Sequence, residues 1–280
     1  MSFRFKRNET VTKAARRLCR ERLDQAMEML ETGAVHDARK QIKKLRAILR
    51  LVRSGIGRTA YEEATGDLRE AAGRLNPMRD AQARLTALGK LAKRSKGQFP
   101  RSILPKLQNS LRQSCKTEEN KWGETVNSVK RYLFAARQQL GSLKVKPNSW
   151  KTLGPGLKKI YGRGRKALAL AEREPSPEHF HDWRKRVKDL ANQLQLLCAA
   201  RSGKIKPCMA DLKHLGHLLG DDHDLFMLNE FIEQNLKRLL ARVIAVRQKK
   251  LRSKALQAGA SFYGQKPRQF CRRVGTGWKK

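Results

Sequence analysis

The stretch VHDARKQIKKLRAILRLV, residues 35–52, indicates the fold of this chain. At about 100° per residue its basic side chains share one face of a helix, and Leu, Ile and Val occupy the opposite face. The basic face contains His36, Arg39, Lys40, Lys43, Ala47 and Arg50. Such a face is typical of a solvated helix and also of a polyanion-binding helix, so this stretch alone does not define a function.

The same pattern occurs a second time. VHDARKQIKKL aligns with FHDWRKRVKDL at an offset of 145 residues. The matched pairs are His36 with His181, Arg39 with Arg184, Lys40 with Lys185, and Lys43 with Lys188. Solvent does not require a particular cation at a particular position, so the repetition favours a binding role.

Two weaker matches flank this motif. Arg20 falls opposite Arg165 at the same offset, which suggests one further cation in each half. LREAAGRLNPMRD aligns with LKHLGHLLGDDHD at an offset of 144, which pairs Asp80 with Asp224. A helix N-cap or an ion pair with a basic strip explains these two carboxylates, and both explanations stay open.

The repeat predicts an internally symmetric, all-α protein. Leu, Ala, Arg, Lys, Gln and Glu dominate, and alternating β-branched runs are absent. We expect one domain made of two antiparallel helical bundles, 1–144 and 145–280, related by an approximate two-fold axis.

Turn signals divide the chain into helices of roughly 15 to 25 residues. The predicted breaks are at 31–34, 54–57, 75–77, 96–100, 145–150, 173–177 and 202–207. Residues 104–140 predict one or two helices. The tail from Gly264 is expected to be irregular and to pack through Phe262, Tyr263, Phe270 and Trp278.

Charge is the dominant property of the composition. The chain has 63 Lys and Arg against 25 Asp and Glu, a formal charge of +38 over 280 residues, which attracts polyanions such as nucleic acid, anionic membrane surfaces or polyphosphate. Five cysteines without a CxxC pair argue against disulfides or structural zinc. No signal-peptide core or spanning apolar run is evident, so the expected location is cytoplasmic, without membrane association.

The segment HLGHLLGDDHD, residues 214–224, raises the possibility of a metal site. Glu70, Gly73 and Arg79 stand opposite His214, His217 and His223, so the repeat does not preserve such a site. We therefore expect no metal and no cofactor.

The motifs at 35–52, 180–197, 68–80 and 212–225, together with the tail ALQAGASFYGQKPRQF, resemble the CHAD (conserved histidine α-helical domain) family over most of the chain. The resemblance implies two symmetric bundles, a basic surface or central channel, and binding of inorganic polyphosphate, often at intracellular granules. It carries the binding role onto His36, Arg39, Lys40, Lys43, Arg46, Arg50, His181, Arg184, Lys185 and Lys188. The second strip departs from the first, with Ala191, Gln195 and Asp189 where the first has Arg46, Arg50 and Lys44.

Three functions are compatible with a chain of this charge. Non-enzymatic polyphosphate binding explains the charge and the doubled strips. RNA or DNA binding is the alternative, although single-strand recognition normally adds aromatic platforms, and the two strips contain only Trp183. Phosphoryl chemistry with His36 and His181 as nucleophile or acid lacks a P-loop or paired metal-binding carboxylates, so we expect no enzyme and, at most, weak non-specific nucleic-acid binding.

Overall fold

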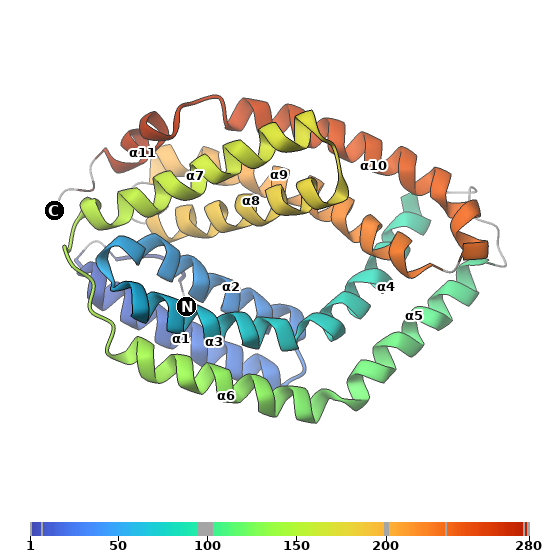
Figure 1. The fold of residues 1–280 in the computed structure, drawn as a ribbon, viewed down its shortest axis with the longest axis horizontal. Helices are drawn as coiled ribbons and strands as arrows, with labels where there is room; N and C mark the ends of the chain where they lie inside the picture. Colours follow the sequence, from blue (N-terminus) through green and yellow to red (C-terminus); the bar gives the residue numbers. More distant parts are fainter. Residues whose placement is uncertain are drawn as a thin grey trace.

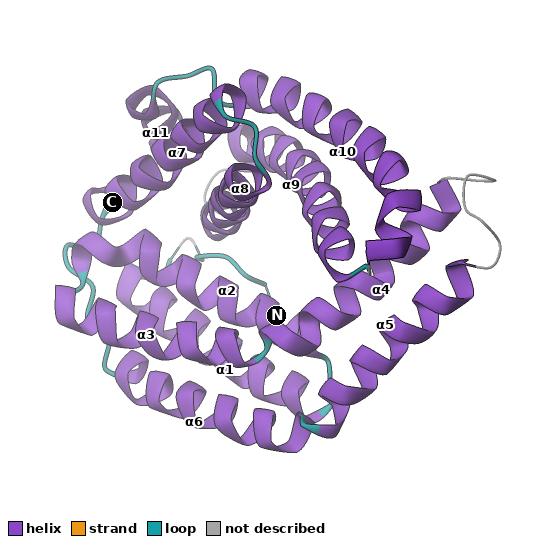
Figure 2. Cartoon of the chain, turned by 45° about the vertical axis from the view of Figure 1, so that its right-hand side comes forward, coloured by secondary structure: helices purple, strands orange, loops and turns teal. Residues whose placement is uncertain are grey.

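The structure is a computed structural model that describes residues 2–6, 8–94, 103–198, 202–232, 234–276 and 278. These residues form α-helices, a short 3-10 turn at Arg53–Gly55 and connecting loops, and no strand occurs among them (Figure 2). The all-α prediction is confirmed.

The helices follow one another with short connections. Residues 11–141 contain α1 (Val11–Glu31), α2 (Val35–Val52), α3 (Arg58–Arg74), α4 (Asn76–Arg94), α5 (Ile103–Asn120) and α6 (Trp122–Gly141). Residues 150–275 contain α7 (Trp150–Arg173), α8 (Pro177–Leu197), α9 (Ser202–Phe231), α10 (Gln234–Phe262) and α11 (Pro267–Gly275). Residues 104–140 therefore belong to two helices, of the one or two predicted.

Helix boundaries coincide with the predicted breaks at 31–34, 54–57, 75–77, 145–150 and 173–177. Side-chain caps explain several of the helix starts. The hydroxyls of Thr10, Ser149 and Ser176 accept hydrogen bonds from backbone N–H groups in the first turns of α1, α7 and α8. The predicted break at 96–100 lies outside the described residues.

Two predictions about the second half are wrong. α9 begins at Ser202 and continues through Pro207, which lies inside the helix. The proline removes one backbone hydrogen bond, but the rest of this 30-residue helix remains continuous. The tail is not irregular, since Pro267 opens α11, and proline is favoured at a first helical position. Its predicted aromatic packing is correct: Phe270 stacks on Tyr161 with ring centroids 4.0 Å apart, and Trp278 lies against Phe5.

The main core joins the first and second parts of the chain. α1 packs against α2 and α6, α3 against α6, and α8 against α7 and α9, while α2 contacts both α7 and α8 (Figure 1). A second, smaller core joins α4 and α5 to α9 and α10 through buried side chains that include Leu88, Leu111, Leu228 and Leu240. The helices with the repeated motif, α2 and α8, are thus neighbours in the middle of the molecule.

Gly156 allows the closest approach between α7 and α2. A Cβ atom at this position would lie 2.5 Å from the carbonyl oxygen of Leu51 and 2.8 Å from that of Arg50. Because both neighbours are backbone atoms, the helices would have to separate. We expect Gly156→Ala to destabilise the protein by about 1–3 kcal/mol, measured by urea unfolding.

The control for this substitution is Gly66→Ala in α3, where nothing lies within 4 Å of an added Cβ. There we expect a slight gain in stability, because alanine has the higher helix propensity. Equal stability of the two variants would contradict the close approach.

Within the described residues, no helix is long and apolar enough to cross a membrane.

Candidate functional site

Two cavities border α2 and α8. The first has a volume of about 550 Å³ and is lined by Arg39, Lys43, Arg46, Arg50, Asn76, Arg79, Asp80, His181, Arg184, Lys185, Arg186, Lys188, Asp189, His223 and Met227. The second has a volume of about 900 Å³, and its lining includes His36, Arg39, Lys40, Lys43, Arg79, Lys90, Arg184, Lys188, Ala191, Gln195, Lys213, His217, Asp221 and Asp224. Five residues line both and are called the shared cations: Arg39, Lys43, Arg79, Arg184 and Lys188.

The structure brings ten of the twelve predicted site residues to these cavities. Arg20 and Arg165 are the exceptions, and their pairing with the motif is not reproduced in space. Arg20 is exposed on α1 and lines a separate cleft beside α6 with Lys13 and Arg137, while Arg165 is exposed on α7. The offset aligned two basic positions, but neither side chain lines either of the two cavities.

Burial changes the ionisation of the shared lysines. It lowers the pKa of Lys43 to about 8 and that of Lys188 to about 7, and the positive charge of nearby Arg184 acts in the same direction. Arg184 itself is only 6% exposed. Lys43, Lys188 and Arg184 therefore do not form an ordinary solvated face. Each has lost part of its hydration, and the nearby carboxylates, such as Asp189 and Asp224, offset only part of that loss.

Several guanidinium groups at the cavities have unused donors. The Nε atoms of Arg39, Arg46 and Arg184 are buried and have no hydrogen-bond partner among the described residues. Arg39 also donates to the carbonyl of Ala72 and to the side chain of Asn76, which fixes its position against α3 and α4. An anion that accepts hydrogen bonds would satisfy such donors, and phosphate oxygens suit the guanidinium geometry.

Arg79 connects the two carboxylates that recur in the repeat. Its guanidinium nitrogens lie 2.8 Å from a carboxylate oxygen of Asp80 and 3.4 Å from one of Asp224. Asp80 lies inside α4 and Asp224 inside α9, so neither caps a helix. Both form ion pairs, but their partner Arg79 lies on α4 and belongs to neither of the two basic strips. Arg79 was not predicted as a site residue, although a basic residue or histidine precedes the recurring aspartate in both halves.

The two motif histidines line different cavities, His181 the first and His36 the second. The Nδ1 atom of His181 lies 3.1 Å from that of His223, a second residue that sequence reasoning missed. Burial, followed by the charges of Lys185 and Arg184, lowers the pKa of His181 to about 4. At neutral pH this imidazole is uncharged, so it can donate a hydrogen bond to an anion but adds no charge.

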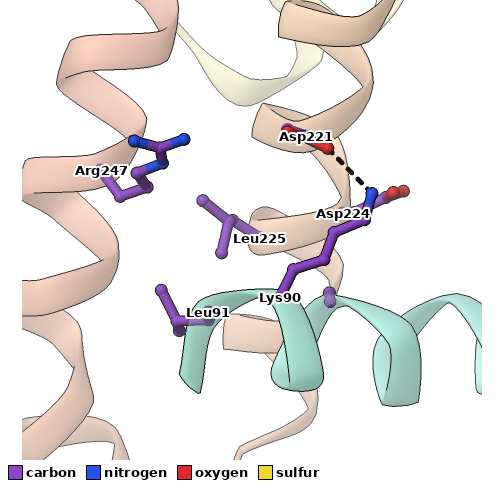
Figure 3. A pocket seen from close by; sticks show the side chains of 7 residues that line it. Lys90, Leu91, Asp221, Asp224, Leu225 and Arg247 are labelled. Atoms are coloured by element: carbon purple, nitrogen blue, oxygen red, sulfur yellow. Dashed lines mark hydrogen bonds and ion pairs between the residues drawn. The ribbon is translucent and has the colours of Figure 1, made fainter. Parts of the chain in front are cut away.

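Acidic and basic side chains also meet at the edge of the second cavity. Figure 3 shows Lys90 of α4 directed toward Asp221 of α9, and their nitrogen and oxygen atoms are 3.1 Å apart. Within the described part of the chain, no three His, Cys, Asp or Glu side chains are grouped in a way that could hold a metal ion.

The described chain is thus an all-helical protein in which buried, partly unpaired cations surround two neighbouring cavities. Comparison with protein families gives the narrower assignment. Residues 10–233 match the CHAD domain, and the chain belongs to this family. A comparison with curated proteins found no match.

Proposed function

We propose that the protein binds inorganic polyphosphate along the two cavities and does not catalyse a reaction on it. The five shared cations carry this proposal, because they border both cavities and allow a linear ligand to pass from one to the other. A polymer with an anionic group on every unit matches such a basic channel, whereas a single small anion would occupy only part of it. Membership of the CHAD family supports the same ligand.

We further propose that the halves are related by an approximate two-fold axis near the shared cations. The first cavity combines the start of α8, at His181 and Lys185, with the end of α2, at Arg46 and Arg50. The second combines the start of α2, at His36, with the end of α8. This exchange of roles between helices is the arrangement that a two-fold axis produces.

The cavity linings favour polyphosphate over RNA or DNA. Apart from histidine, no aromatic residue among those the structure describes lines either cavity. Trp183, the one aromatic residue of the strips, is fully buried against Gly259 and cannot stack on a base. Nucleic acids would therefore be held only through their phosphates, and weakly. The same polyphosphate binding would bring the protein to intracellular polyphosphate granules.

The test is competition between labelled long-chain polyphosphate and unlabelled single-stranded RNA or duplex DNA, at matched phosphate concentration and physiological salt. We expect polyphosphate to compete at least tenfold better than either nucleic acid, and no orthophosphate to be released. If about eight phosphates are neutralised, log K should fall against log salt with a slope of roughly −5 to −6. Orthophosphate competing as well as the polymer, or a slope near zero, would argue against the proposal.

A further inference from the structure

The two cavities are counterparts, but they are not equal. Arg46 and Arg50 line the first cavity at the end of α2, and Ala191 and Gln195 occupy the matching positions at the end of α8 in the second. The first cavity has a volume of about 550 Å³ and is lined by nine Lys or Arg side chains. The second has a volume of about 900 Å³ and is lined by eight. Positive charge is therefore denser in the first cavity.

Arg46 makes the larger contribution to this difference. Arg50 forms an ion pair with Asp189, which compensates its charge. The Nε of Arg46 is buried and has no partner in the described residues, and burial lowers the pKa of this guanidinium. Of the two positions that differ at the helix ends, Arg46 is thus the one that gives the first cavity an available cation where the second has Ala191.

We propose, on the basis of the proposed function, that the first cavity is the primary site and binds short oligophosphates such as tripolyphosphate. The second cavity then engages only the part of a longer chain that extends past the shared cations. A short chain that can reach either cavity populates the one with the additional donor. One charge-assisted hydrogen bond is enough to shift this occupancy by roughly tenfold.

The repeat supplies a matched pair of variants, Lys185→Ala and Lys40→Ala. Lys185 lines only the first cavity and Lys40 only the second, at equivalent positions of α8 and α2. Their side chains are 49% and 58% exposed, and each pairs with the aspartate three residues earlier, Asp182 or Asp37. The two substitutions therefore remove the same charge from comparable surroundings.

The experiment is isothermal titration calorimetry of the full chain with tripolyphosphate and with long-chain polyphosphate. With tripolyphosphate, we expect Lys185→Ala to weaken binding at least threefold more than Lys40→Ala, and Arg46→Ala to weaken it at least tenfold. With the long polymer, the two lysine variants should differ by less than twofold, because such a chain occupies both cavities.

An equal loss of tripolyphosphate affinity in the two lysine variants, or a larger loss for Lys40→Ala, would overturn the proposal that the first cavity is the primary site. The proposal that the protein binds polyphosphate would remain. No binding of either ligand to the unsubstituted protein would instead overturn the proposed function. Circular dichroism checks that each variant is folded. If Arg46→Ala fails to fold, the two lysine variants still show which cavity is the primary site. Both lysine side chains are about half exposed, so their removal should not disturb the fold.

Discussion

Replacing Lys43 and Lys188 together by glutamate is expected to weaken long-chain polyphosphate binding at least a hundredfold. Both residues are shared cations, so the change affects the two cavities at once. Each reversal removes an attraction and adds a repulsion, and a hydrogen bond to a charged group contributes about 1.5–3 kcal/mol. Filter binding or calorimetry at fixed salt measures the loss. Arg39 is less suitable for this test, because its bonds to Ala72 and Asn76 also support the fold.

The matched control is Arg268→Glu with Arg272→Glu in α11. Both side chains are exposed, neither lines the two cavities, and the change in formal charge is the same. We expect a loss below tenfold, from weaker long-range attraction alone. Equal losses for the cavity and α11 variants would mean that net charge by itself binds the polymer.

The second large effect is a loss of affinity with rising pH. In the free protein, burial lowers the pKa of Lys188 to about 7 and that of Lys43 to about 8. A bound polyanion stabilises the protonated amines, so the complex holds more protons than the free protein above these pKa values. Binding then takes up protons, and affinity falls as pH rises, by up to roughly tenfold per pH unit for each lysine.

Dissociation constants for long-chain polyphosphate, measured between about pH 6 and pH 9, test this prediction. A long chain is chosen so that its few terminal phosphates contribute little titration of their own. Calorimetry in buffers of different ionisation enthalpy reports the proton uptake directly. Lys188→Met should make the affinity less dependent on pH. Arg268→Lys, which is remote from the cavities, should leave the pH dependence of the affinity unchanged. A flat profile for the unsubstituted protein would contradict protonation of these lysines on binding.

The helices were largely predictable because their signals are local. Ser176 before Pro177 begins α8, and Gly33, which has a φ of 70°, follows α1. The errors at Pro207 and Pro267 have different causes. Pro267 occupies a first helical position, where proline is favoured, whereas α9 continues through Pro207 in its interior, which no local signal predicts.

By itself, the sequence determined the all-α class, the repeated basic face and ten of the residues that line the cavities, because helical periodicity decides which side chains share a face. Only the tertiary structure decided which faces meet. It brought the faces of α2 and α8 together, inserted Arg79 between Asp80 and Asp224, and left Arg20 and Arg165 exposed elsewhere. The physical reason is that contacts between distant helices depend on how apolar faces pack in the core, which no local pattern encodes.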